Sequence, residues 1–280
     1  MNDVKTETTT KGSIPHYAAL IFFSALFIFP LYLAFVLALS AWNTTPGLVP
    51  VGFHPENFKY ATTLINFWHY TKNSIIICAI TLITSTLTSG LVGYAFARIA
   101  VPGRNVLFMI VLSTMMLPGI VTQIPQYILF HNYGLLDTFW PWLFWGLGGN
   151  AFFIFMYRQF FSAIPKELEE AARIDGCSIF RTYWNIFLPM SFPVIATVSI
   201  MTFQGSWGDF MGPFMFLKQD HYPLATALSM ISYKFEGQED MILTSVSTAA
   251  AILLIVPVLV TFFLGQRYIV EGIVTTGVKG

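Results

Sequence analysis

Residues 73–97, NSIIICAITLITSTLTSGLVGYAFA, decide the fold, because this stretch contains no charged side chain. An α-helix rises about 1.5 Å per residue, so roughly 20 residues cross the ~30 Å hydrocarbon layer of a bilayer. A Lys, Arg or Asp at the centre of such a helix costs about 2.5 to 3.5 kcal/mol. An uncharged stretch of this length therefore predicts a membrane-spanning helix.

Five further stretches share this property and contain at least 20 residues each: 12–55, 105–136, 138–157, 182–208 and 241–266. Charged residues make up only 10% of the chain and hydrophobic residues 55%, whereas roughly 25% charge is typical of a globular protein. Buried core helices in a soluble domain seldom repeat at this length. We predict an all-α integral membrane protein with six transmembrane helices, near 17–42, 73–97, 106–128, 139–157, 187–210 and 243–265.

The first apolar stretch is interpreted as a retained span. A signal peptide has an apolar run of roughly 7 to 15 residues, and residues 17–42 exceed that length. The chain then divides into an N-terminal tail (1–16), a six-span domain (17–266) and a C-terminal tail (267–280).

The basic residues set the orientation. With a cytoplasmic N-terminus, ten of the 14 fall on the inner side: Lys5, Lys11, Arg98, Arg104, Arg158, Lys166, Arg173, Arg181, Arg267 and Lys279. Only Lys59, Lys72, Lys218 and Lys234 fall on the outer side. Because positive residues concentrate on the cytoplasmic side of membrane proteins, both termini are predicted to be cytoplasmic.

Two spans are not uniformly apolar. The second contains small and hydroxylated residues, which let helices approach closely, so it is predicted to lie inside the bundle. The third contains Pro118, Gly119 and Pro125, and proline interrupts the hydrogen bonds of a helix. This run predicts a kinked helix beside a cavity.

Five polar or aromatic residues are candidates for a solute path. The amides of Gln123, Gln126 and Asn150 either bond between helices or line a polar translocation path, since a buried amide without a partner is costly. Asp209, beside Trp207, is either an acid at the membrane interface or an outer gate that contacts solute. The sequence leaves both choices open.

The longest cytoplasmic connection, about 158–189, has the composition of two short helices. Pro165 can start the first, with acidic residues in its early turns where the helix dipole favours them. Gly176 can end it in a left-handed conformation, and Ser178 can cap the next. The predicted apolar residues are Leu168, Ala171, Ala172 and Ile174 on the first helix, and Ile179, Phe180, Tyr183 and Trp184 on the second. This helix–turn–helix either docks into a partner's groove or lies on lipid.

The connection also carries a fixed-spacing motif. Glu170-Ala171-Ala172 is followed after three residues by Gly176, and after nine more by Ile186 and Leu188-Pro189. This pattern resembles the EAA loop of bacterial ABC-importer permeases. The segments YRQFFSAIPKELEEAARIDG and QRYIVEGIVTTGVKG resemble the carbohydrate branch of that family, the second membrane subunit of the maltose type.

The resemblance implies a set of partners and roles. The EAA loop of such permeases forms coupling helices that sit in a cleft of a cytoplasmic ATP-binding subunit. It implies a dimer of that subunit, which binds ATP and Mg, a homologous sister permease, an extracytoplasmic solute-binding protein and a sugar substrate. The implied location is the bacterial inner (plasma) membrane, and the implied coupling residues are Glu170, Ala171, Ala172, Asp175, Gly176, Leu188 and Pro189.

The sequence offers little for other functions. It has no glycine-rich phosphate loop, so no cofactor is expected in this chain. The cysteines and histidines are dispersed, so no metal site is expected, and no basic face suits nucleic acid. No catalytic cluster supports a membrane enzyme, and an ion-coupled carrier would need intramembrane ionisable residues and internal repeats. The function expected is a non-enzymatic permease subunit of an ATP-driven importer of oligosaccharide or disaccharide, working by alternating access, with glycerol phosphate or polyol as alternative cargo.

Overall fold

The computed structural model describes residues 13–42, 44–45, 47–63, 65–236 and 242–277, and helices are the only regular secondary structure in these ranges. The predicted all-α class is confirmed. Lys5, Lys11 and Lys279, which entered the orientation argument, lie outside the described residues. The chain divides into two units, residues 1–65 with 232–253 and residues 66–231 with 254–280.

The first unit contains α1 (Ser13–Ala38), whose apolar side chains are exposed except near its end, and α2 (Glu56–Thr63). Its polar centre is Asn57, which is fully buried. The Asn57 amide nitrogen donates to the carbonyls of Ala38 and Ser40, 2.9 Å each, and its oxygen accepts from the Trp42 indole at 2.8 Å. These bonds satisfy the carbonyls at the end of α1 and fix α2 against it.

The second unit is built around α3 (Phe67–Arg98), against which α6 (Trp140–Gly148), α7 (Ala151–Ala163) and α11 (Phe192–Trp207) pack. Its buried face includes Ser85, Ser89, Gly90 and Gly93. A Cβ at Gly93 would lie 2.5 Å from the Cβ of Tyr157, so glycine is what permits α7 to approach so closely. The prediction that this small-residue helix lies inside the bundle is confirmed.

The predicted third span is a bent pair of helices. The segment formed by α4 (Arg104–Ser113) and the 3₁₀ turn η2 (Thr114–Met116) meets α5 (Gly119–Asn132) at 97°. Leu117 and Pro118 at the break have extended backbone conformations, because proline disfavours helix in the residue before it. The predicted kink is confirmed.

The predicted single helix over 139–157 is wrong. α6 ends at Gly148, Gly149 has a φ of 70°, and Asn150 starts α7 as its N-cap. The Asn150 side-chain oxygen accepts from the backbone N–H groups of Phe152 and Phe153 at 2.9 and 3.3 Å. Two adjacent glycines followed by a capping residue end one helix and begin another.

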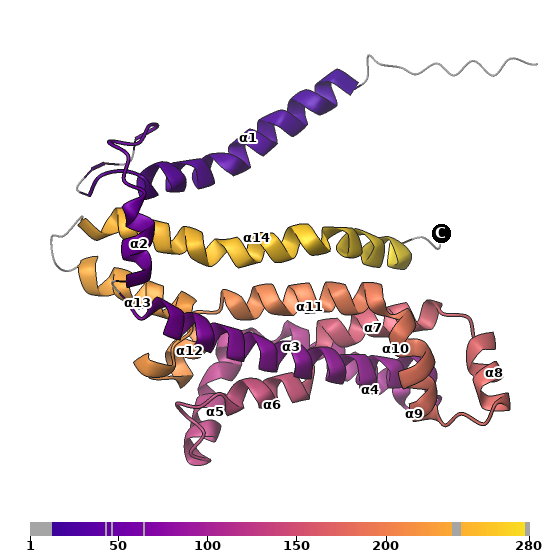
Figure 1. The fold of residues 1–280 in the computed structure, drawn as a ribbon. Coiled ribbons are helices and arrows are strands. Elements are labelled where there is room, and N and C mark those ends of the chain that lie inside the picture. The colour runs from indigo at the N-terminus through magenta and orange to yellow at the C-terminus, as the bar shows by residue number, and fades with distance from the viewer. Residues whose placement is uncertain (1–12, 43, 46, 64, 237–241, 278–280) are drawn as a thin grey trace, which may run out of the picture. The chain divides into compact units, whose positions relative to one another are not determined.

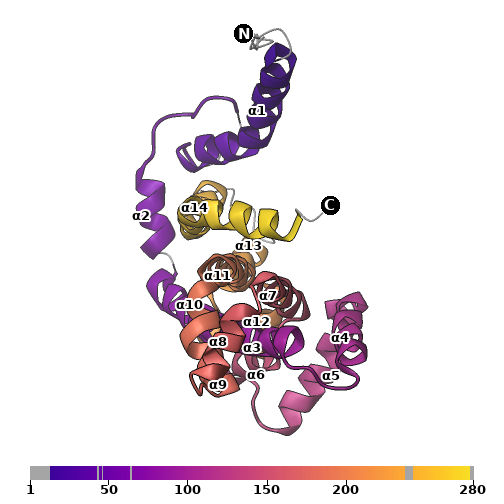
Figure 2. The ribbon, with the colours of Figure 1, turned by 90° about the vertical axis from the view of Figure 1, so that its right-hand side faces the viewer.

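The remaining short elements are α8 (Glu167–Ile174), α9 (Ile179–Thr182), the π-helical turn η3 (Tyr183–Phe187), α10 (Leu188–Met190), α12 (Met211–Phe216) and the 3₁₀ turn η4 (Gln219–His221). The last two helices are α13 (Leu224–Glu236) and α14 (Ile242–Gly277). Within the second unit, α8 and α9 lie at one end and α5 and α12 at the other (Figure 1), and Figure 2 views the unit from the end with α8 and α9.

Within the described ranges, three helices are long and apolar enough to cross a membrane: Pro15–Ala38, Phe67–Arg98 and Thr244–Tyr268. Two bent pairs raise the number to five, if each pair is one span: α4–η2 with α5, and Ile179–Met190 with α11, the second bent by 78°. The break at Gly149 leaves α6 and α7 too short to be counted. The six-span arrangement therefore stays a prediction.

Candidate functional site

The predicted helix–turn–helix is present at one end of the second unit. α8 starts just after Pro165, and the backbone N–H groups of Glu169 and Glu170 donate to the Lys166 carbonyl, 3.0 Å each. Three acids occupy the first turn of α8, where the partial positive charge of the helix N-terminus stabilises them.

The turn that ends α8 depends on Gly176, which has a φ of 75°. The Gly176 N–H donates to the Arg173 carbonyl at 3.0 Å, and the Cys177 N–H reaches back to Ala172 at 2.9 Å. Ser178 then caps α9, its hydroxyl accepting from the Arg181 N–H at 3.3 Å. Both the left-handed glycine and the serine cap agree with the sequence prediction.

The exposed face of α8–α9 is partly acidic and partly apolar. Glu170, Ala171 and Asp175 are exposed, and Ile174, Ile179 and Phe180 are 86%, 53% and 59% exposed. Ala172 is buried. Leu168 and Trp184 are also exposed, so most of the predicted apolar patch is accessible.

Tyr183 departs from that predicted patch because it is buried. It belongs to the π-helical turn η3, and Tyr183 and Phe187 lie 5.1 and 5.0 Å from the ring of Tyr94 on α3. Phe161 of α7 completes the cluster, 5.8 Å from Phe187. Aromatic contacts at these separations stabilise beyond simple area burial. Through them the end of the α8–α9 connection is part of the core formed by α3 and α7.

Leu188 and Pro189, the last two residues of the motif, follow directly in α10. Leu188 is half-buried and packs against the aromatic cluster, whereas Pro189 is exposed. Pro189 lies in α10, which follows η3 directly, and because it has no backbone N–H it donates no hydrogen bond to that preceding turn.

Arg98, at the end of α3, is a residue whose role the sequence did not reveal. Its side chain is 5% exposed, and its guanidinium donates to the carbonyls of Phe161 and Ile164 at the end of α7. The guanidinium also lies 4.9 Å from the ring centre of Phe187 and 3.9 Å from the Glu169 carboxylate of α8. A cation at a helix C-terminus is stabilised by the carbonyl dipoles. Arg98 thus ties together α3, α7, α8 and η3.

The five predicted solute-path residues are dispersed. Gln126 is half-buried on α5, and the side-chain oxygen of Gln123 is buried with no hydrogen-bond partner among the described residues. Asn150 is exposed and caps α7, while its backbone N–H donates to the Ser89 hydroxyl at 3.1 Å. Across the described ranges no hydrogen bond joins any two of the five.

Trp207 and Asp209 have local structural partners. The Trp207 indole is buried and donates to the Leu254 carbonyl at 2.9 Å. Asp209 accepts from the Gly212 N–H at 3.1 Å and so satisfies one backbone donor in the first turn of α12. Gln123 thus has a buried side-chain oxygen with no partner among the described residues, which a solute or water could satisfy.

A hydrogen-bonded cluster joins two loops at the other end of the unit. Asp137, with a φ of 59°, accepts from the Lys218 N–H at 2.9 Å and pairs with His221 Nδ1 at 2.8 Å. Burial raises the pKa of Asp137, but the hydrogen bonds and positive charges of His221 and Lys218 outweigh it and lower that pKa below its usual value. In the described part of the chain, no three metal-binding side chains lie close enough to hold an ion.

Long apolar helices, bent helix pairs and a helix–turn–helix exposed at one end define a polytopic membrane protein. The chain belongs to the family described as binding-protein-dependent transport system inner membrane component, whose model matches residues 89–274.

Two similar proteins belong to one group within that family. The chain is 31% identical to the arabinooligosaccharides transport system permease protein AraQ of Halalkalibacterium halodurans, over 80% of this chain and 79% of AraQ. It is 27% identical to the maltodextrin transport system permease protein MalD of Streptococcus pneumoniae, over 100% and 99% of the two chains.

A solved structure shares the fold. This is a chain of a bacterial ABC transporter involved in the import of the acidic polysaccharide alginate, matched with a TM-score of 0.79 and 21% identity over 95% of this chain and 99% of that one. The predicted membership among ABC sugar permeases is confirmed.

Proposed function

We propose that this chain forms half of the translocation path of an ATP-driven importer of oligosaccharides. A homologous sister permease completes the path, an ATP-binding subunit dimer binds ATP and Mg, and an extracytoplasmic binding protein delivers the sugar. This chain itself catalyses no reaction. The proposal rests on the family, on the sugar-transporting relatives and above all on the exposed helix–turn–helix that carries the EAA spacing.

In the proposed topology both termini are cytoplasmic. The six crossings are α1, α3, α4 with α5, α6 with α7, α11 and α14. The α8–α9 connection then faces the cytoplasm, as the distribution of basic residues favours. The short helices α6 and α7 cross as a pair, with Asn150 capping α7 beside α3.

Coupling in this proposal runs through the exposed face of α8–α9. Glu170 pairs with a basic group of the ATP-binding subunit, while Ala171 allows close contact and Gly176 keeps the turn. Because the aromatic cluster and Arg98 join α8 and η3 to α3 and α7, a displacement of α8 moves those helices with it. Alternating access would follow from that movement.

Uptake measurements test the proposal. In membrane vesicles holding the complete transporter, Glu170→Lys and Gly176→Asp should lower ATP-dependent oligosaccharide uptake by more than about tenfold. The first reverses a charge at the interface, which costs several kcal/mol, and the second places a charged side chain on a turn with a φ of 75°. Glu167→Gln, on the same helix but outside the motif, is the matched control. ATP hydrolysis in the two variants should no longer respond to loaded binding protein.

Two further results would contradict the proposal. Normal uptake in both motif variants would reject the role of α8–α9, and uptake that survives ATP depletion but stops when the ion gradient collapses would indicate an ion-coupled carrier. Glycerol phosphate and polyols are tested as competing cargo, because this chain alone does not define the sugar.

A further inference from the structure

A cavity of about 430 Å³ lies between the α3–α4 turn, the end of α7 and α8. Its charged lining residues are Arg98, Arg104, Lys166, Glu169, Glu170 and Arg173. Four basic and two acidic side chains give this cavity a net positive charge, although the whole chain has a formal net charge of zero.

Much of the lining charge is already paired within the protein. Glu169 binds Arg173 at 2.7 Å and faces Arg98 at 3.9 Å, and Arg98 is further held by the two carbonyls of α7. These groups therefore form the wall of the cavity and leave little charge for a ligand.

Arg104 and Lys166 are different because they are largely unpaired. Arg104 donates to the Ile99 carbonyl at 3.2 Å, which uses one of the five N–H donors of a guanidinium. Lys166 and Glu170 make no side-chain hydrogen bond or ion pair to any residue that the structure describes. Even if Glu170 neutralises one of the two cations, one positive charge remains for an anion.

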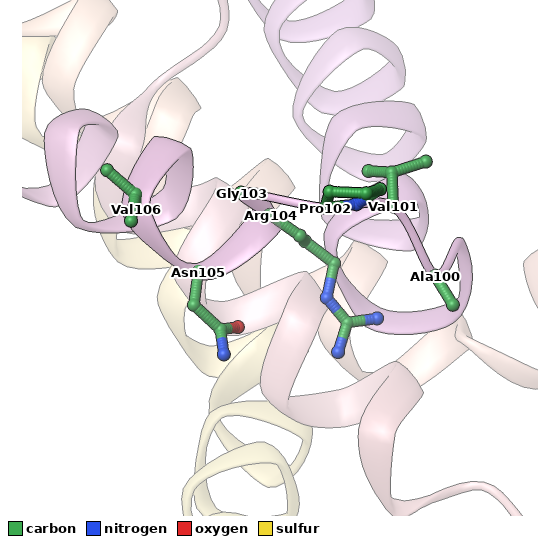
Figure 3. A pocket seen from close by; sticks show the side chains of 7 residues that line it. All are labelled: Ala100, Val101, Pro102, Gly103, Arg104, Asn105 and Val106. Carbon is green, nitrogen blue, oxygen red and sulfur yellow. The ribbon is translucent and has the colours of Figure 1, made fainter.

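A second cavity, of about 500 Å³, adjoins the first through Ala100 and Arg104 and is lined by residues 100–106. Figure 3 shows Arg104 and Asn105 extending from one side of this turn, and Val101 and Val106 extending from the other. Val101 and Val106 are 51% and 55% exposed. A cationic cavity beside exposed aliphatic side chains fits a ligand with a charged head and an apolar chain.

We propose that Arg104 and Lys166 bind a phosphate-bearing anion in this cavity, and that an anionic phospholipid of the cytoplasmic leaflet supplies it. The bound phosphate would link the start of α4 to the start of α8. This inference goes beyond transport itself, and its test measures binding, so its failure is distinguishable from failure of the proposed function.

The test uses the full chain, purified with its co-extracting subunits into nanodiscs of phosphatidylcholine with or without phosphatidylglycerol. Native mass spectrometry measures how much phosphatidylglycerol each variant retains. Arg104→Gln with Lys166→Gln should lower its affinity roughly 25-fold, since each basic residue near a membrane surface contributes about a factor of five. Arg104→Lys with Lys166→Arg should retain binding, and Arg181→Gln, which removes an exposed charge outside the cavity, should leave it unchanged.

A second arm adds inorganic phosphate to the phosphatidylcholine nanodiscs. If the protein retains this phosphate only when Arg104 and Lys166 are present, the anion site is supported, with soluble phosphate as its ligand. Equal phosphatidylglycerol retention by all variants, with no such phosphate binding, would overturn the proposal. A second result would also overturn the proposal: the double glutamine variant loses the ATP-binding subunit but binds lipid and phosphate as before. Arg104 and Lys166 would then contact protein and not an anion.

Discussion

Replacing Arg98 with methionine should destabilise the end of the second unit at which α8 lies. Methionine keeps the apolar stem but removes the two hydrogen bonds to the α7 carbonyls and the interaction with Glu169. A hydrogen bond to a charged group contributes about 1.5 to 3 kcal/mol. Because Glu169 can still pair with Arg173, we expect a total loss of roughly 3 to 5 kcal/mol.

Thermal unfolding of the detergent-solubilised chain measures this loss. Cys78 is 5% exposed on α3, so a thiol-reactive fluorescent dye labels it only on unfolding, and Cys177→Ser removes the other thiol. The midpoint of Arg98→Met should fall on the order of 10 °C. The midpoint of Arg98→Lys should lie between those of Arg98→Met and the parent protein, because an ammonium group keeps the charge but lacks the planar, forked hydrogen-bond donors of a guanidinium.

Arg181→Met is the matched control for this experiment, since Arg181 is an exposed arginine on the neighbouring helix α9. Its midpoint should remain that of the parent protein. If Arg98→Met melts together with Arg181→Met, then the contacts of Arg98 do not stabilise this end of the bundle and our reasoning is refuted.

Three further predictions concern the unfolding midpoint. The first two use the dye assay, and the third follows tryptophan fluorescence, because a protonated thiol does not react with the dye at acid pH. Gly93→Ala should lower the free energy of unfolding by about 1 to 3 kcal/mol because its Cβ would meet α7 at 2.5 Å. Gly205→Ala, with no atom within 4 Å of its Cβ, should cause no such loss. Equal midpoints for the two variants would contradict the packing argument. Gly176→Ala should cost about 1 to 2 kcal/mol because of its φ of 75°, and Gly176→Asn less; identical losses would reject the left-handed turn as the cause. Because folding lowers the pKa of Asp137, its contribution to the free energy of unfolding is complete above the usual pKa of 3.8 and is lost as pH falls through the lower folded value. Asp137→Asn should flatten this acid dependence of the midpoint. An unchanged pH profile would argue against the pairing with His221.

The sequence predicted those parts of the fold that depend on local composition. The apolar run at 73–97 indicated α3, and Pro118 indicated the bend between η2 and α5, because chain length in a bilayer and the geometry of proline are local properties. The break at Gly149 was missed, since two glycines inside an apolar run are compatible with a transmembrane helix. The composition of 139–157 does not reveal that Asn150 caps a new helix.

The candidate site was predicted to a similar degree. Gly176 and Ser178 ended and began helices as expected, because the turn and the cap depend on the residue itself. The buried position of Tyr183 was missed, since it depends on a π-helical turn and on α3 and α7, which are distant in sequence. Arg98 was counted only as a cytoplasmic charge, because nothing near it in sequence identifies the carbonyls of Phe161 and Ile164 as its partners.

The π-helical turn η3 also constrains which insertions and deletions the chain tolerates. A π-helical turn accommodates about one residue more than an α-helical turn, and successive residues of an α-helix are about 100° apart around its axis. Deleting one residue between Tyr183 and Phe187 would favour an ordinary α-helix and rotate α9 by roughly that angle relative to α10. Phe180, now exposed, would then face a different direction. Length variation among related chains should therefore avoid this segment and accumulate in the loops that follow α1 and α5.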